Sequence, residues 1–394
     1  MRKLFVFVFP ALLLALALVH PQRTLAQSVH PTRPPIQVGA GYLESQGAKV
    51  NFKSNNKMTP QGKAAMQQNQ IISVRTFTQS FTFQGTVFPY TMVGNDPTRG
   101  GPTFFDTQLI PISFFFDEFV DQNGNNIVID ANPIVPTFLN SPNFQPSNYT
   151  SGFTQFGDAV QRAEFFNVAQ PSWRNLLERP EILPTVQVEV PVGSALVFQS
   201  TVNGTIFALI DFGFMASQLN TIVQLEPLRV DSLPIALTRN ALFFDGSPNQ
   251  CCTLGFHTAF ETKSIGPLHF VQTFAFATWP EAGIFVNPDF SDAIAISHEI
   301  SEWMNDPFAN NVVPTWQSPS GQGCSNLLET GDPVEGLPHP AFPVTIDGVT
   351  YHPQTEALLP WFSRPAKNTL SIGGAFSYPD TTTLPTASAP CTNP

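Results

Sequence analysis

The chain of 394 residues has 18 basic and 29 acidic side chains, which give a formal net charge of −11 at neutral pH. An acidic chain without a run of Lys or Arg lacks the electrostatic footprint of a protein that binds nucleic acid or an anionic membrane surface. The 37 Phe residues favour a folded core over disorder, and the 38 Pro residues favour short strands joined by long, rigid loops.

Residues 1–26 have the pattern of a secretory signal peptide. Arg2 and Lys3 precede an apolar run that extends to Val19, and a small-residue cleavage site ends at Ala26. The alternative interpretation is an uncleaved membrane anchor. The run is short for a membrane span of about 20 residues, which favours the cleaved signal. We therefore expect a secreted or periplasmic protein with no stable membrane insertion after cleavage.

The remaining chain changes character twice. Residues 27–70 are polar with little periodicity and are expected to form an extended or disordered arm. Residues 71–150 contain β-branched and aromatic runs broken by Gly and Pro, which predict a β-rich region. Residues 151–394 combine a helical pattern near Phe156 with further strand-like runs, including HFVQTFAFATW at 269–279. The pattern predicts an α+β fold with a domain boundary near residue 150.

Four cysteines lie in the last part of the chain, at positions 251, 252, 324 and 391. In an exported protein, two disulfides are expected. A bond between the neighbours Cys251 and Cys252 requires a strained eight-membered ring, so we expect each of them to pair with Cys324 or Cys391. A metal site of thiolates is the alternative, although the chain has no C-x-x-C pair.

The segment AISHEISEWMNDPF, residues 295–308, has helix signals at both ends. Ser291 is a suitable N-cap, Asp292 lies in the first turn, and Pro307 ends the pattern. These signals predict a helix over about residues 292–305.

His298 and Glu302 of this segment are four positions apart and therefore project from one face of the helix. Two side chains at this separation can bind one metal ion. Glu299 is then turned toward the space beside the ion, where it could accept a proton from a bound water. The alternative is that Glu302 is a solvated helix residue and that His298 is its partner.

A third protein ligand has to come from elsewhere in the chain. The first choice is Glu329 in GCSNLLETGDPVEG, residues 323–336. Asp306 is the second choice, because it lies one helical turn beyond Glu302. Asp332 is either a ligand or a carboxylate that orients His298, and the alternative is an Asp before Pro in a turn.

The sequence His298-Glu299-x-x-Glu302 resembles the H-E-x-x-H signature of zincin-type metallopeptidases. The resemblance covers about residues 265–335 and implies a zincin-like C-terminal half, with zinc or another divalent metal as cofactor and a peptide or protein as substrate. It also implies that the strand at 269–279 binds the substrate as an added strand. Glu302 in place of the second histidine makes the site more anionic and gives it a harder ligand. Three outcomes follow from this change: zinc bound in a different way, another divalent ion, or an inactive site.

Two other histidines are candidates for a role at this site. His257 lies five residues beyond Cys252, the second of the two adjacent cysteines. It is a possible ligand or substrate contact, and the alternative is a core or loop histidine. His352 has the same two interpretations. The expected function is a secreted metal-dependent peptidase, and the alternative is a non-catalytic extracellular binding or surface protein that retains the scaffold.

The signal peptide gives the first testable prediction. The secreted protein should begin near Gln27, because Ala26 ends the cleavage site. N-terminal sequencing of secreted material is the measurement. An intact Met1 would contradict the prediction.

Overall fold

The computed structural model describes residues 32–57, 63–64, 68, 70–321 and 323–392. The expected signal peptide, residues 1–26, lies outside the described residues. From Thr32 onward the described chain forms one compact unit. The strand-rich α+β class that the sequence predicts is confirmed, with one large curled sheet as the main element.

The large sheet has 13 strands within the described part of the chain, and it mixes parallel and antiparallel pairs. Its order is β1 (Ile36–Val38), β14 (Ala195–Ser200), β15 (Ile206–Asp211), β17 (Ala241–Phe244), β18 (Cys251–Ile265), β19 (Leu268–Trp279), β16 (Leu233–Arg239), β7 (Thr107–Val120) and β12 (Glu181–Ile182). Four further strands pair with it: β2 (Asn51–Lys57) with β18, β3 (Ile71–Ile72) with β19, and both β8 (Asn126–Ile129) and β13 (Val186–Val190) with β7.

Two-stranded sheets and helices surround it. The strand pairs are β4 (Thr76–Phe83) with β5 (Thr86–Val93), β6 (Pro102–Phe105) with β11 (Arg174–Leu177), β9 (Ser147–Tyr149) with β10 (Gly152–Thr154), β20 (Val312–Gln317) with β21 (Cys324–Leu327), β22 (Val344–Ile346) with β23 (Val349–Tyr351), and β24 (Glu356–Ala357) with β25 (Ser377–Tyr378). The α-helices are α1 (Tyr42–Ser45), α3 (Val135–Leu139), α4 (Phe156–Glu164), α5 (Phe212–Leu225), α6 (Ile294–Asn305), α7 (Asp332–Glu335) and α8 (Leu359–Ser363). Two 3-10 helices are η1 (Asn132–Ile134) and η2 (Ile372–Gly374).

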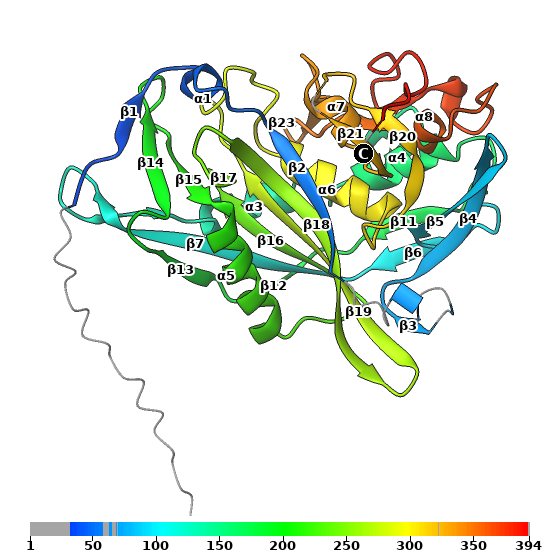
Figure 1. Cartoon of the computed structure of the whole chain (residues 1–394), viewed down its shortest axis with the longest axis horizontal. Coiled ribbons are helices and arrows are strands. Elements are labelled where there is room, and N and C mark those ends of the chain that lie inside the picture. The colour runs from blue at the N-terminus through cyan, green and yellow to red at the C-terminus, as the bar shows by residue number, and fades with distance from the viewer. Residues whose placement is uncertain (1–31, 58–62, 65–67, 69, 322, 393–394) are drawn as a thin grey trace, which may run out of the picture. The chain divides into compact units, whose positions relative to one another are not determined.

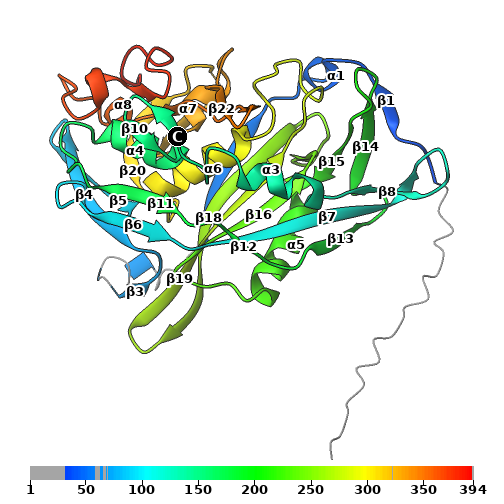
Figure 2. The same ribbon diagram turned by 180° about the vertical axis from the view of Figure 1, so that it is seen from behind.

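The sheet separates two hydrophobic cores, as Figures 1 and 2 show by the placement of α5 and α6 on opposite faces. On β19, Ala275 and Ala277 belong to the core that contains α6, whereas Phe274 and Phe276 belong to the core that contains α5. Side chains that alternate along a strand point to opposite faces, so both faces of the central strands are buried. This explains why the strand at 269–279 has apolar residues at both even and odd positions.

Strand pairing bears on three expectations from the sequence and corrects the one about β19. β19 has β18 on one side and β16 on the other, so it is an interior strand and cannot add a peptide as a further strand. The described part of the segment 27–70 contains β1 and β2, which pair with β14 and β18. Strands from both sides of residue 150 share the large sheet, because β7 pairs with β13.

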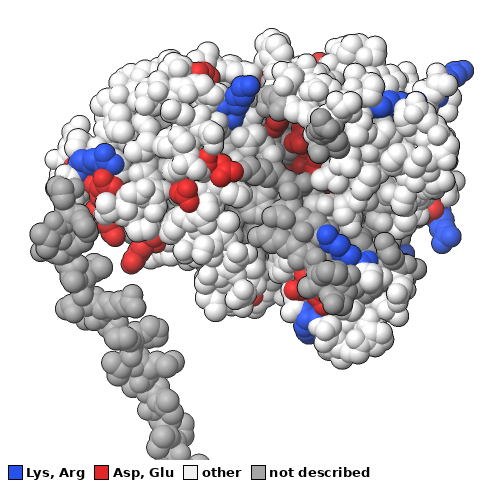
Figure 3. Space-filling view, in the orientation of Figure 1, with Lys and Arg blue, Asp and Glu red and all other residues white. Residues whose placement is uncertain are grey.

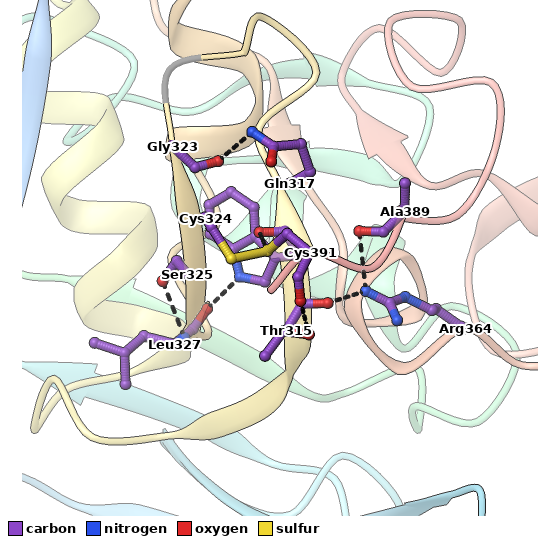
Figure 4. The surroundings of a disulfide bond; sticks show 10 residues. Thr315, Gln317, Gly323, Cys324, Ser325, Leu327, Arg364, Ala389 and Cys391 are labelled. Atoms are coloured by element: carbon purple, nitrogen blue, oxygen red, sulfur yellow. Dashed lines mark hydrogen bonds between the residues drawn. A yellow bond between two sulfur atoms is a disulfide. The ribbon is translucent and has the colours of Figure 1, made fainter. Parts of the chain in front are cut away.

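The cysteine pairing differs from the one that the sequence predicts. Cys251 pairs with Cys252 within the start of β18, and Cys324 pairs with Cys391. The predicted bonds that join Cys251 and Cys252 to Cys324 and Cys391 are wrong, because the end of the chain runs along β20 and places Cys391 beside β21. Figure 4 shows this arrangement, in which Thr315 Oγ1 donates to the backbone oxygen of Cys391 at 2.9 Å. The bond closes a separation of 67 residues, which corresponds to a stabilisation of about 4 kcal/mol.

Helix α6 is held against the sheet by α4, and α4 contains a buried acid. Glu164 is fully buried, and one of its carboxyl oxygens accepts a hydrogen bond from the backbone N–H of Leu359 at 2.6 Å. Burial raises the pKa of Glu164 to about 8, although that hydrogen bond opposes the shift. The folded protein therefore retains a proton here at neutral pH.

This proton predicts a pH dependence of stability. The pKa of Glu164 rises from its usual 4.5 to about 8 on folding, so the folded state binds more protons in this window and the free energy of unfolding decreases as the pH rises through it. The loss contributed by Glu164 is at most about 5 kcal/mol. The free energy of unfolding, measured with urea at several pH values between 4.5 and 8, should fall less steeply with pH in Glu164→Gln than in the wild type.

Glu178 lies in an exposed position and provides the matched control. Glu178→Gln should keep the wild-type slope. An unchanged slope in Glu164→Gln would show that Glu164 is ionised in the folded protein.

Candidate metal centre

Helix α6 carries three of the candidate residues and is enclosed on every side. All 12 of its residues are buried. Trp303 Nε1 donates to Thr273 Oγ1 of β19 at 2.9 Å, and Gln161 Nε2 of α4 donates to the backbone oxygen of Met304 at 2.9 Å. These contacts fix the helix from two directions. The alternative in which Glu302 is solvated is wrong, because its exposed fraction is 1%.

The helix begins slightly later than predicted. Asp292 has a backbone φ of 43°, which is outside the right-handed helical region, and the helix starts at Ile294. Ser291 does not cap it, because its hydroxyl donates to the backbone oxygen of Pro288 at 2.7 Å. Asp292 instead accepts a hydrogen bond from the N–H of Ala293.

His298 is oriented by neighbours on three segments. Its ring stacks on Phe52 of β2 with 3.7 Å between ring centroids. Its Nδ1 lies 3.1 Å from Oε1 of Gln354, and Nε2 of Gln354 donates to the backbone oxygen of Gly331 at 2.6 Å. Because the amide oxygen can only accept, Nδ1 carries a proton and Nε2 is the nitrogen available to a metal.

The first group of possible ligands surrounds this nitrogen. Nε2 of His298 lies 3.0 Å from Oε1 of Glu302 and 3.6 Å from Oδ1 of Asp332. The possible ligand atoms of these three residues all lie within 4.8 Å of one another. Glu302 is also fixed by the backbone N–H of Gly331, which donates to its Oε1 at 3.2 Å.

A second group forms on the other oxygen of Glu302. Nδ1 of His257, in β18, lies 3.2 Å from Oε2 of Glu302 and 3.5 Å from Oε2 of Glu299. These residues also have possible ligand atoms within 4.8 Å of one another. On the far side of the ring, Nε2 of His257 lies 3.9 Å from Oε2 of Glu329. Glu329 therefore lies near His257, and Glu299 faces His257 and Glu302.

Two glycines make space for the charged side chains. A Cβ atom at Gly331 would lie 2.2 Å from Nδ1 of His298, and one at Gly255 would lie 2.5 Å from Oε1 of Glu299. Neither glycine has a positive φ, so the requirement is for space and not for backbone freedom. Gly331, in the segment at 323–336, is thus packed against the His298 ring.

The two imidazoles and the carboxyl groups shift one another's pKa values. Burial lowers the pKa of both histidines, but the nearby carboxylates outweigh it, chiefly Glu329 at His257 and Glu302 at His298, and both pKa values lie well above the usual range. Burial raises the pKa of Glu302, but the imidazoles outweigh it and the net shift is downward. Burial raises the pKa of Glu299 to about 7.

More carboxyl groups lie around the centre than positive groups that could balance them. Glu335 and Glu356 are buried, and burial raises the pKa of Glu335 to about 8 and that of Glu356 well above its usual value. The negative charge of Glu302 adds to both upward pKa shifts, and the positive charge of His298 opposes both. Buried carboxylates are costly unless they are protonated, paired or bound to a cation. The centre therefore has the chemistry of a site for a divalent cation.

A cavity of about 570 Å³ reaches the first group. Phe52, Asp332 and Glu335 contribute to its lining, together with Cys251 and Cys324 from the two disulfides. The side chain of Asp332 is 27% exposed, in contrast to 1% or less for His298 and Glu302. Asp332 thus connects the buried centre to the cavity, and Figure 3 shows acidic atoms within a recess where Figure 1 labels β2 and α7.

Two other predicted candidates have different roles among the described residues. The carboxylate of Asp306 accepts hydrogen bonds from the backbone N–H groups of Asn310 and Asn311, each at 2.9 Å, and it belongs to neither group. His352 lies at the start of α6, with its Nδ1 2.7 Å from Oδ2 of Asp292.

Sequence reasoning missed three contributors, Gln354, Glu335 and Glu356. Gln354 follows a loop histidine and a proline, and no spacing connects it with His298. Glu335 lies in the segment at 323–336, three residues beyond Asp332, and Glu356 lies in a separate segment. Only the fold brings them to the helix.

Comparisons of this chain with protein-family models, with curated proteins and with solved structures find no match. Among the described residues, no helix combines the length and apolar character needed to cross a membrane.

The contact at Gly331 gives a prediction for stability. Gly331→Ala should lower the free energy of unfolding by about 1 to 3 kcal/mol, the usual range for an overpacked interior, because the new methyl group must displace the His298 ring. Urea unfolding of the ion-free protein is the measurement. Gly323→Ala is the control, since a Cβ there meets nothing within 4 Å, and it should change the free energy by less than about 0.5 kcal/mol. Equal values for both variants would contradict the prediction.

Proposed function

We propose that this chain is a secreted metal-dependent hydrolase of peptide bonds, in which His298, Glu302 and Asp332 bind the ion. The observation that carries the proposal is the position of this group, at the junction between a buried excess of carboxyl groups and a cavity. Three protein ligands with an open side are the usual arrangement of catalytic zinc sites.

The surrounding residues prepare this group for an ion. Gln354 holds the His298 ring with Nε2 toward the two carboxylates, which is the second contact commonly found on a metal-bound imidazole. The backbone N–H of Gly331 holds Glu302. One imidazole and two carboxylates accept zinc, and their oxygen content also suits harder ions such as manganese.

A bound ion would polarise a carbonyl group and lower the pKa of its water. The chain itself supplies a proton donor at the cavity. Glu335 lines the cavity beside Asp332, and its Oε2 is buried and makes no hydrogen bond. Burial raises the pKa of this carboxyl to about 8 in the ion-free protein, and in its protonated form Glu335 can donate to a leaving amine.

The choice of a peptide bond rests on the resemblance of H-E-x-x-E to the zincin signature. The expected strand addition at 269–279 is not part of the proposal, because β19 is interior. Glu299 is not assigned as the proton acceptor, because it faces His257 and Gly255 instead of the cavity.

The second candidate is a non-catalytic extracellular binding protein that retains the helix as scaffold. Its support is the burial of the centre, since His298 and Glu302 are at most 1% exposed. The two candidates differ in metal content and in cleavage of peptides.

The proposal predicts different outcomes for two variants. His298→Ala should lose the ion held by Glu302 and Asp332, because the only imidazole of the group is removed. Glu335→Gln should keep the metal content and lower turnover of a peptide library by about 100-fold, the usual scale for a positioned proton donor. Metal analysis and mass spectrometry of the cleaved library are the measurements.

Asp245, another acid in the cavity lining, provides the matched control. Asp245→Asn should keep turnover within about tenfold of the wild type, because it lies outside the ligand group. A wild-type protein that binds an ion but cleaves no peptide would favour the binding protein. A wild-type protein that binds no zinc or manganese would overturn the proposal.

A further inference from the structure

The two oxygens of the Glu302 carboxylate contact different histidines. Oε1 lies 3.0 Å from Nε2 of His298, and Oε2 lies 3.2 Å from Nδ1 of His257. The two imidazoles come from different layers, since His298 is on α6 and His257 is on β18. Glu302 thus lies between two groups that each have the composition of a metal site.

Two members of the second group, His257 and Glu299, have polar atoms that are buried without hydrogen bonds. Both ring nitrogens of His257 and both carboxylate oxygens of Glu299 make no hydrogen bond of acceptable geometry, and both side chains have an exposed fraction of 0%. Buried polar atoms in folded proteins nearly always have a partner. A bound cation supplies a partner for an imidazole nitrogen and two carboxylates at once.

We propose that His257, Glu299 and Glu302 bind a second divalent cation, and that the Glu302 carboxylate bridges the two ions. The proposal rests on the metal site that the proposed function assigns to His298, Glu302 and Asp332. A carboxylate that binds through both oxygens suits ions about 3.5 to 4 Å apart, the spacing of two-metal hydrolases. In such a centre one ion can hold the attacking oxygen and the other the carbonyl oxygen.

The second centre gives roles to two residues that the sequence assigned differently. Glu299 becomes a ligand, which agrees with its contact to His257 and its position over Gly255. Glu329 lies on the Nε2 side of the His257 ring, 3.9 Å away. A carboxylate on that side favours the tautomer in which Nδ1 is free to bind the ion.

The test is the number of ions bound by the full secreted chain after removal of metal and reloading with Mn²⁺. We expect two ions per wild-type chain by mass spectrometry of the metal, and an electron paramagnetic resonance spectrum that shows magnetic coupling between them. His257→Ala and Glu299→Gln should each bind one ion and lose the coupling. His352→Ala is the matched control and should bind two, because His352 pairs with Asp292 at the start of α6.

Each outcome decides between the two proposals. One uncoupled ion in the wild type, unchanged in His257→Ala and Glu299→Gln but lost in His298→Ala, would overturn the second centre and leave the proposed function standing. No ion in the wild type would overturn both. If a variant does not fold, the coupling in the wild-type spectrum decides, since a single ion cannot produce it.

Discussion

The Glu302 carboxylate is the interaction on which the interior of this protein depends. It contacts both imidazoles and the backbone of Gly331, and it connects α6 with β18 and with the segment before α7. Breaking one partner of a buried charged group leaves an uncompensated charge, which typically costs several kcal/mol. The neighbouring side chains therefore have to be placed as one unit, and the glycines at 255 and 331 are part of that unit.

The sheet provides the rigidity that such a unit requires. β18 and β19 have apolar side chains on both faces and helices against both, so a histidine on β18 is held in place by two cores. Local motion usually begins where few apolar contacts are buried. A site on a strand of this kind is more exactly positioned than one on a loop, which favours metal chemistry over loose binding.

The sequence predicted the parts of the structure that depend on local pattern. The strand at 269–279, the helix with His298 and Glu302, and the strand-rich class follow from the local pattern, although Ser291 does not cap the helix. The pairing of the cysteines and the interior position of β19 depend on contacts between distant segments, and they were predicted incorrectly. The orienting role of Gln354 also depends on such contacts and was not foreseen. His257 was considered only because it follows two cysteines, whereas its actual connection to the centre is the register of β18 under α6.

The disulfides have a consequence for how the cavity behaves. Cys251 and Cys324 both line it, but only Cys324 is joined to a residue far along the chain, Cys391, so one wall of the cavity is covalently crosslinked. The Cys324–Cys391 bond also ties down the last residues of the chain, which would otherwise fray as chain ends commonly do. Reduction of the Cys324–Cys391 bond would therefore remove this crosslink from the wall of the cavity and leave the His, Glu and Asp side chains of the centre chemically unchanged.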